Sequence, residues 1–197
     1  MKSEFLNVFP TLVASFDLSG EVDNDMLIKK MEMAGNLDHG LLENGVSSYV
    51  NGEDCFLTRL AVKDLKKSIE YYLNEYCLQG GIAPNYIINS WANIVSDKGF
   101  VRRHRHEKSI LSGAYYPVDS DSCLLLENPN TVFHMTQTNV NDTIYPRQQL
   151  RIMPTAGKLV IWPSYIYHHT EINSNVKRYT ISFNTLDDSY KDAINRR

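Results

Sequence analysis

The sequence predicts an α+β protein that is mainly β, in which N-terminal helices support a barrel or jelly roll of short strands. Two observations indicate this class. The chain before Gly81 contains two helical patterns, and the chain after it consists of short apolar runs separated by Gly, Pro, Asn and Asp. A length of 197 residues also suits one core. We therefore expect a single domain over residues 1–197, with helical support at about 20–80 and a β core at about 86–184.

The N-terminal part begins with a strand pattern and continues with a helix. Residues 8–18, VFPTLVASFDL, are typical of a strand. Residues 23–36 predict a helix that Asp23 or Asn24 caps, with a broad apolar side made by Met26, Leu27, Ile28, Met31 and Met33. Residues 38–59 are rich in turn-forming residues and give no clear pattern.

The clearest helical pattern covers residues 62–79 and ends at Gly80-Gly81. Its apolar residues recur at three- or four-residue spacing, namely Val62, Leu65, Ile69, Leu73 and Cys77. Beyond the glycines we expect short strands at 86–95, 100–106, 109–118, 123–127, 131–136, 148–153, 158–162 and 177–184.

Composition and charge limit the classes of function. The net charge of -3 makes nucleic-acid binding unlikely, because nucleic-acid binders carry a basic excess. Three scattered cysteines form neither a disulfide framework nor a zinc motif. We see no signal peptide, and no apolar run approaches the roughly 18 residues of a membrane span. We expect a cytoplasmic protein. The oligomeric state stays open, and a homo-oligomer is possible.

Three histidines form a candidate metal site. His104 and His106 lie two residues apart in an expected strand, so their imidazoles point to one face. His168 follows a later strand, and a rolled sheet would bring it across to them. Imidazole binds zinc, copper, iron and nickel, and non-haem iron oxygenases commonly use two histidines and a carboxylate. Taken alone, the histidines also fit solvated or packed side chains.

A late strand carries a polar face. Arg178, Thr180, Ser182 and Asn184 alternate with the apolar Tyr179, Ile181 and Phe183. A guanidinium group binds a carboxylate through two hydrogen bonds, and a hydroxyl group two residues away can add another. Arg178 and Thr180 therefore predict a clamp for a carboxylate ligand, although a solvated strand face would look the same in sequence.

These motifs occur in an order that resembles a known superfamily. The chain has HxH at 104–106, LSGAYY at 111–116, WPSxxxH at 162–168 and RxTxSFN at 178–184. This set resembles the iron(II)/2-oxoglutarate-dependent oxygenases. More closely, it is similar to a largely bacterial and phage-encoded subfamily with HxHxxxxLSGxYY, FPSxLxH and RxSxSFN motifs. If a phage encodes the protein, the expected location is the host cytoplasm. Trp162 stands where that subfamily often has phenylalanine, and Thr180 where it often has serine.

The resemblance implies a double-stranded β-helix, which is a cupin-like jelly roll, with Fe(II) and 2-oxoglutarate as cofactors. Fe(II) would be held by His104, His106 and His168. The resemblance further implies that 2-oxoglutarate would be bound by Arg178 and Thr180, by Tyr116 or Tyr115, and by Asn93.

One departure concerns the second position of the metal motif. Most of the superfamily has HxD or HxE where this chain has HxH. A straight strand turns Glu107 away from His104 and His106, so we expect three histidine ligands. A β-bulge could rotate Glu107 inward, which keeps it as a rival ligand.

The function implied by the resemblance is that of a dioxygenase. It would couple the decarboxylation of 2-oxoglutarate to succinate with the oxidation of a prime substrate by O2, and hydroxylation is the expected outcome. The prime substrate is unknown; a protein side chain such as proline and a small metabolite are both candidates. Two alternatives are a cupin-like three-histidine metalloenzyme that does not use 2-oxoglutarate, and a non-catalytic jelly-roll binding module.

The remaining histidines are expected to be structural. His39 and His134 fit packed or loop positions, and His169 fits a structural position or the rim of the pocket. Gly113, inside an apolar strand, is expected to allow close packing or a bulge.

Overall fold

A computed structural model describes residues 3–4, 6, 8–34, 37–49, 55–59, 62–130, 147–174 and 176–189. The strand expected at 131–136, with His134, lies outside these residues.

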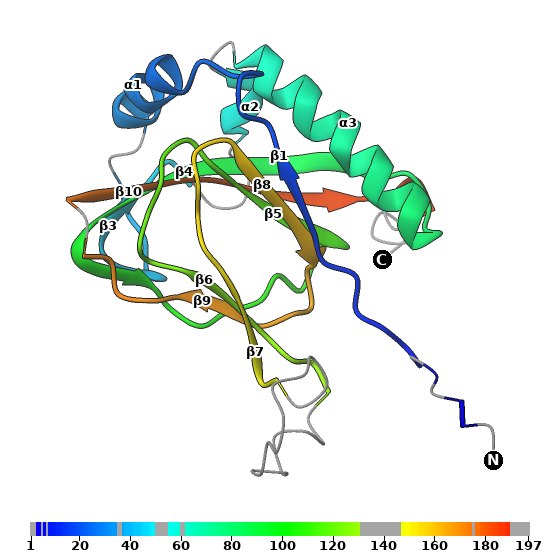
Figure 1. Ribbon diagram of the computed structural model, residues 1–197. Helices are drawn as coiled ribbons and strands as arrows, with labels where there is room; N and C mark the ends of the chain where they lie inside the picture. The colour runs from blue at the N-terminus through cyan, green and yellow to red at the C-terminus, as the bar shows by residue number, and fades with distance from the viewer. Residues whose placement is uncertain are drawn as a thin grey trace.

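Two antiparallel sheets form the body of the described structure (Figure 1). The larger sheet has the order β1–β8–β5–β10–β4–β3–β2, and the smaller has the order β7–β6–β9. In chain order the strands are β1 (Ala14–Asp17), β2 (Leu37–Asp38), β3 (Leu42–Ser47), β4 (Tyr86–Val101), β5 (Leu111–Tyr116), β6 (Leu124–Glu127), β7 (Gln149–Ile152), β8 (Lys158–Pro163), β9 (His168–Thr170) and β10 (Lys177–Leu186). Neighbours in each sheet pair antiparallel. After β5 the chain passes to the smaller sheet for β6 and β7, returns to the larger sheet for β8, and crosses again for β9 and for β10, in the manner of a jelly roll. The predicted mainly β class with supporting helices is confirmed.

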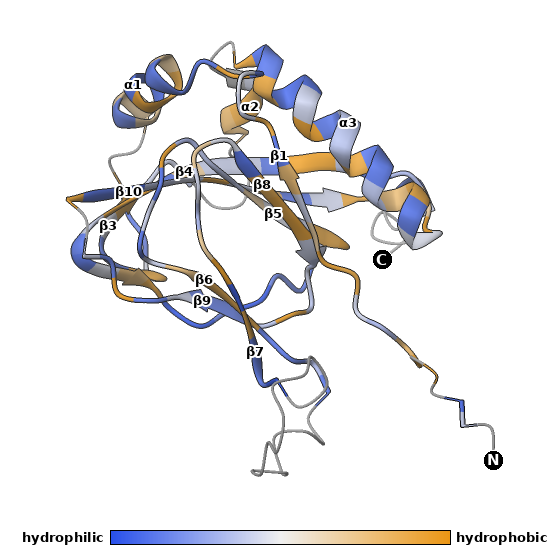
Figure 2. Ribbon diagram, in the orientation of Figure 1, coloured by the Kyte–Doolittle hydropathy of each residue, from blue (hydrophilic) through white to orange (hydrophobic). Residues whose placement is uncertain are grey.

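Three helices cover the outer face of the larger sheet: α1 (Asn24–Ala34), α2 (Phe56–Arg59) and α3 (Lys63–Gly80). Their hydrophobic sides are turned toward the sheet (Figure 2). The predicted apolar stripe of α3 is confirmed, because Leu65, Ile69 and Leu73 are buried in the same core as residues of β10. Gly81 ends α3 in the left-handed conformation, with φ of 62°, as expected for a glycine after a helix.

Strand β10 has two buried faces. Tyr179, Ile181 and Phe183 belong to the core beneath the helices. The alternate residues line a cavity between the two sheets, namely Arg178, Thr180, Ser182 and Asn184. The predicted division of this strand into an apolar and a polar face is therefore confirmed.

The first strand is shorter than predicted. Only Ala14–Asp17 pairs with β8, in a register that places Ala14 opposite Ile161. Extending the ladder by two residues would place Leu12 opposite Pro163, which has no N–H group to donate. The ladder therefore ends, and residues 8–13 lie outside the sheet.

The segment that contains His104 and His106, residues 102–106, is called the histidine segment below, and it also differs from its prediction. Residues 86–101 form one continuous strand. At Gly99 the backbone of β3 lies close, because a Cβ atom added there would be 2.5 Å from the Glu43 carbonyl oxygen. The segment after Val101 is not a strand. Its backbone N–H groups donate to carbonyl oxygens of three separate segments: that of Arg102 to Leu41, that of His104 to His168, and that of His106 to Ser164. The prediction of a strand at 100–106 was wrong, although side chains two residues apart still converge.

Gly113 gives a test of the packing between β5 and β10. A Cβ atom added at Gly113 would overlap the ring of Phe183, which is fully buried. We expect Gly113→Ala to lower the free energy of unfolding by about 1–3 kcal/mol, the usual cost of overpacking a core. Urea denaturation measures this, with Gly40→Ala as the control because nothing lies within 4 Å of the added atom. Equal stability of the two variants would contradict the packing described here.

Candidate active site

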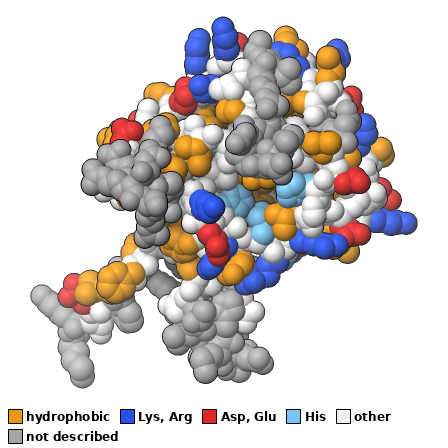
Figure 3. Space-filling model, turned by 180° about the vertical axis from the view of Figure 1, so that it is seen from behind, with side chains coloured by type: hydrophobic (Ala, Val, Ile, Leu, Met, Phe, Trp, Pro, Cys, Tyr) orange, Lys and Arg blue, Asp and Glu red, His pale blue; other side chains and the backbone are white. Residues whose placement is uncertain are grey.

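The candidate site is a cavity of about 610 Å³ between the two sheets. Its walls come from β4, β5, β8, β9 and β10, and from the histidine segment. Histidine side chains are visible in a hollow on the face shown in Figure 3. The cavity thus lies where the polar face of β10 meets the smaller sheet.

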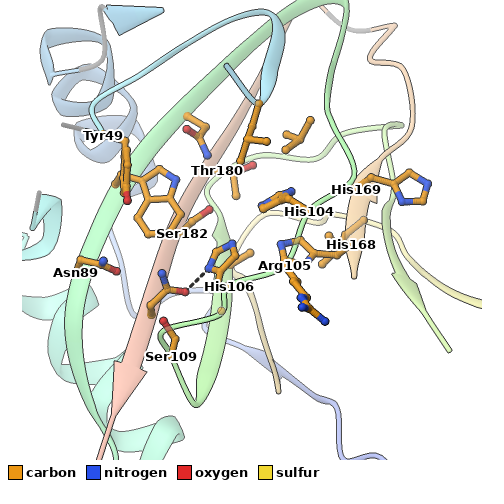
Figure 4. Close-up of a pocket in the computed structure, with 18 of the residues that line it drawn as sticks. Tyr49, Asn89, His104, Arg105, His106, Ser109, His168, His169, Thr180 and Ser182 are labelled. Carbon is orange, nitrogen blue, oxygen red and sulfur yellow. Dashed lines mark hydrogen bonds between the residues drawn. The ribbon is translucent and has the colours of Figure 1, made fainter. Parts of the chain in front are cut away.

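The structure brings His104, His106 and His168 together inside this cavity (Figure 4). One ring nitrogen of each lies within 4.8 Å of the others. His104 and His168 form an isolated antiparallel bridge, with N–H to O distances of 2.9 and 2.8 Å. This bridge fixes the spacing of two histidines that are far apart in sequence, and the third follows two residues after the first.

The hydrogen bonds of the three rings leave the same nitrogen free in each. Nδ1 of His104 lies 2.8 Å from the Arg102 carbonyl oxygen, and Nδ1 of His168 lies 3.0 Å from that of Ile166. A carbonyl oxygen only accepts, so both Nδ1 atoms carry the proton. Nδ1 of His106 bonds to Oδ1 of Asn184. Each Nε2 therefore keeps a lone pair, which is the arrangement that metal-binding histidines require.

The three imidazoles are neutral at ordinary pH. Burial lowers the pKa of His104 to about 4, and the neighbouring His106 adds to the effect. Burial also lowers the pKa of His106. The pKa of His168 lies well below its usual value, because of burial first and the two other histidines second. Neutral rings can coordinate a cation without first losing a proton, so the donor set fits a divalent transition metal.

Arg178 is a buried cation in the same cavity. Its side chain is 2% exposed, and burial lowers its pKa. Its guanidinium donates to Oγ1 of Thr180 at 2.7 Å and to the Ser122 carbonyl oxygen at 3.3 Å. No acidic residue of the described chain forms an ion pair with it. A buried charge without a counter-ion is costly, so this position favours an anionic ligand.

Two further polar atoms line the cavity without protein partners. The hydroxyl group of Tyr116 and Nε1 of Trp162 are buried and make no hydrogen bond within the described structure. The Arg178 guanidinium lies 5.3 Å from the centre of the Tyr116 ring. Both atoms can donate to an oxygen-rich ligand bound beside Arg178.

The two tyrosines predicted for the co-substrate lie on opposite faces of β5. Tyr116 faces the cavity, whereas Tyr115 lies in the core beneath the helices and donates to Oδ1 of Asn24 at 2.7 Å. Asn93 of β4 lines the cavity opposite Thr180 in the strand register. Of the predicted residues around 2-oxoglutarate, only Tyr115 therefore lies away from the cavity.

Glu107 is turned outward. Its side chain is 71% exposed and pairs with Arg105 at 2.7 Å, and it does not belong to the group of potential metal ligands. His169 points away from the three histidines (Figure 4), and its Nδ1 lies 3.7 Å from Glu127. His39 lies at the cavity wall, with its ring 5.2 Å from that of Tyr49.

Some cavity residues were not predicted. Tyr49 follows β3 in the region that gave no clear pattern, and its ring lies 5.1 Å from Trp91. Asn184 was predicted to share the polar face of its strand, but its bond to His106 could not be foreseen. A signal for Asn184 existed in the alternation of residues 178–184, and none existed for Tyr49.

A cluster of neutral histidines in a jelly roll, beside a buried unpaired arginine, is the arrangement of a non-haem metal oxygenase. The sequence profile of the family described as "Putative 2OG-Fe(II) oxygenase" matches residues 89–184. The profile match, together with the shared fold, indicates a 2OG-Fe(II) oxygenase, which is an oxidoreductase. No curated protein sequence matches the chain.

Solved structures share the fold at low sequence identity. A prolyl-4-hydroxylase from Pseudomonas putida is 14% identical, with 88% of this chain and 92% of that chain covered and a TM-score of 0.57. HygX from Streptomyces hygroscopicus, with nickel, 2-oxoglutarate and hygromycin B bound, is 10% identical over 90% of this chain and 84% of that one, with a TM-score of 0.57. The viral collagen prolyl hydroxylase of Paramecium Bursaria Chlorella virus-1 is 11% identical, with 88% of this chain and 94% of that chain covered and a TM-score of 0.56.

The family settles the cofactors. Proteins of this fold have been crystallised with nickel or iron together with 2-oxoglutarate, and this chain holds the three-histidine cluster. Fe(II), 2-oxoglutarate and O2 are therefore its metal and co-substrates. No helix in the described part of the chain is long and apolar enough to cross a membrane.

The buried histidines predict that the metal-free protein becomes less stable in acid. Their folded pKa values are lower than their unfolded values, so the unfolded chain binds more protons as the pH falls below about 6.5. For His104, with a folded pKa of about 4, the loss is about 2 kcal/mol between about pH 7.5 and about pH 5. Chemical denaturation of metal-free protein at several pH values measures it, and His104→Gln should flatten the dependence. An unchanged slope in that variant would contradict the prediction.

Proposed function

We propose that the protein is a 2-oxoglutarate-dependent hydroxylase in which His104, His106 and His168 hold Fe(II) and Arg178 holds the distal carboxylate of 2-oxoglutarate. The observation that carries this proposal is the buried Arg178, which has no acidic partner in the described chain and shares one cavity with three neutral histidines. A structural arginine at this depth would need a carboxylate of its own.

The ligand set accounts for the departure from the usual motif. His106 takes the position that a carboxylate holds in most of the superfamily, and the exposed Glu107 is engaged with Arg105. Three neutral ligands leave the charge of the metal uncompensated, and the two carboxylates of 2-oxoglutarate can offset it. Arg178 and Thr180 orient one carboxylate, while the hydroxyl group of Tyr116 supplies a further donor nearby.

The bound cofactors supply the oxidation: 2-oxoglutarate and O2 give succinate and carbon dioxide while one oxygen atom enters a C–H bond of the prime substrate. The contribution of the protein is orientation and exclusion of water. Nδ1–H bonds aim the imidazoles, and Arg178 fixes the distance of the co-substrate from them. Trp162, Leu124 and Ala114 line the inner end of the cavity with apolar surface.

The outer end of the cavity is the proposed binding place of the prime substrate. Tyr49 and Trp91 form an aromatic wall with ring centres 5.1 Å apart, and Trp91 lies 5.8 Å from His106. Tyr49 lies across the cavity from His104 and His168 in Figure 4. Aromatic faces favour contact with apolar ring surfaces. A prolyl side chain fits this wall, and two structures of the same fold are prolyl hydroxylases.

Replacing Arg178 by methionine tests the role of the arginine. Arg178→Met keeps the length of the side chain and removes the charge, so we expect 2-oxoglutarate to bind about 100-fold more weakly, from the loss of about 3 kcal/mol of charged hydrogen bonds. Fe(II) binding should persist, and the thermal stability of the ligand-free variant should be equal or higher. Anaerobic titration with Fe(II) and 2-oxoglutarate, followed by the weak visible charge-transfer band and by succinate formation in air, measures these effects.

The matched control is Arg151→Met, an exposed arginine of β7 paired with Glu171 outside the cavity. It should bind 2-oxoglutarate as the wild type does. Joint loss of metal, co-substrate and stability in Arg178→Met would make Arg178 a structural residue. A wild type that shows neither the band nor succinate would overturn the proposed function itself.

The aromatic wall is tested with a peptide of Pro-Gly repeats as the probe. Tyr49→Ala should retain Fe(II) and 2-oxoglutarate binding, but should lose about 5-fold in peptide-dependent succinate formation, because an aromatic contact contributes about 1 kcal/mol beyond its buried area. Tyr165→Ala is the control, since Tyr165 is exposed and lies outside this cavity. Absence of hydroxyproline in the peptide after turnover by the wild type would reject a prolyl substrate.

A further inference from the structure

We propose that Asn184 is a positioning residue that keeps the proton of His106 on Nδ1, so that Nε2 stays available to a metal ion. The inference rests on the proposed metal site and adds to it a residue that does not bind the metal. Asn184 is a buried residue of β10 that lines the cavity, and its Oδ1 bonds to Nδ1 of His106, as the dashed line in Figure 4 marks.

His106 needs a side chain for this purpose, whereas the other two histidines do not. His104 and His168 each bond through Nδ1 to the carbonyl oxygen of the residue two positions earlier. The equivalent acceptor for His106 would be the carbonyl oxygen of His104. That oxygen already accepts from the N–H group of His168 at 2.8 Å, as part of the bridge that brings the two ligands together. In the structure the acceptor for His106 is instead a side-chain oxygen from another strand, Oδ1 of Asn184 on β10.

The surroundings of Asn184 make the position of the proton depend on this one acceptor. Oδ1 of Asn184 also accepts from Oγ of Ser112 at 2.8 Å, and Ser112 lies 2.8 Å from Oγ of Ser164. Ser112 is also 3.3 Å from Nδ1 of His106. Without the amide oxygen, the Ser112 hydroxyl group is the nearest polar atom, and it can donate to Nδ1. The imidazole would then carry its proton on Nε2, where it blocks metal binding.

The test compares Asn184→Leu, which removes the acceptor at similar size, with Asn184→Asp, which retains it. Nitrogen-15 chemical shifts of metal-free protein above the pKa of His106 report which ring nitrogen is protonated, and competition with a chelating dye gives the affinity for Zn(II). In Asn184→Leu we expect His106 to change to the Nε2–H form, while His104 and His168 keep theirs, and Zn(II) to bind about 10- to 100-fold more weakly. In Asn184→Asp the Nδ1–H form and tight binding should both remain.

Ser182→Ala is the matched control, because Ser182 lines the same cavity on the same strand two residues away. It should leave the tautomer and the Zn(II) affinity unchanged. If Asn184→Leu does not fold, Asn184→Val carries the same test with a smaller side chain. An Nδ1–H tautomer and wild-type affinity in the apolar variant would overturn the role of Asn184 alone. Failure of the wild type to bind Zn(II) would instead overturn the proposed metal site.

Discussion

Burial of both faces of β10 is the constraint on which the rest of the structure depends. The strand pairs with β4 on one side and β5 on the other, so it occupies an inner position in the larger sheet. Its apolar face completes the core under the helices, and its polar face forms the inner wall of the cavity. A buried polar face is tolerable only where each group finds a partner. Thr180 and Asn184 have hydrogen-bond partners in the protein. The partners of Arg178 are neutral oxygens, so its charge is left uncompensated.

The metal-binding geometry follows from the topology of the two sheets together with a backbone bridge between one pair of residues. His104 leaves the larger sheet after β4, and His168 begins β9 in the smaller sheet. Two hydrogen bonds between their backbones join the sheets at the edge of the cavity. The same bonds use the backbone acceptor that His106 would otherwise share. Beside this pairing, the third histidine takes its acceptor from β10, as Oδ1 of Asn184.

Much of the fold and of the candidate site could be predicted from the sequence, because the period of two in residues 178–184 and the spacing of HxH are local signals. The errors came from contacts between distant segments. The ladder of β1 stops because its partner ends in Pro163, and the backbone of the histidine segment turns to Leu41, His168 and Ser164. These partners lie far away in the chain, so no local pattern reveals them.

The two tyrosines of β5, Tyr115 and Tyr116, also show that a local sequence pattern cannot predict which side chain reaches the cavity. Alternation requires Tyr115 and Tyr116 to face opposite sides, but the sequence does not say which side holds the cavity. The register of β5 against β10 decides it, with Ser182 opposite Ala114 and Ile181 opposite Tyr115. Tyr115 consequently shares the apolar face of Ile181, and Tyr116 faces Arg178.

Charge explains why the proposed site works as a unit. Within the described lining the acidic residue is Glu107, which is exposed and paired with Arg105. A divalent metal held by three neutral imidazoles, together with Arg178, concentrates positive charge in a buried place. In the two-histidine, one-carboxylate sites of other oxygenases the protein supplies part of the opposing charge. Here the dianion of 2-oxoglutarate would supply it, and Arg178 would hold one of its carboxylates. Metal and co-substrate then favour each other's binding, and that coupling is reciprocal by thermodynamic necessity.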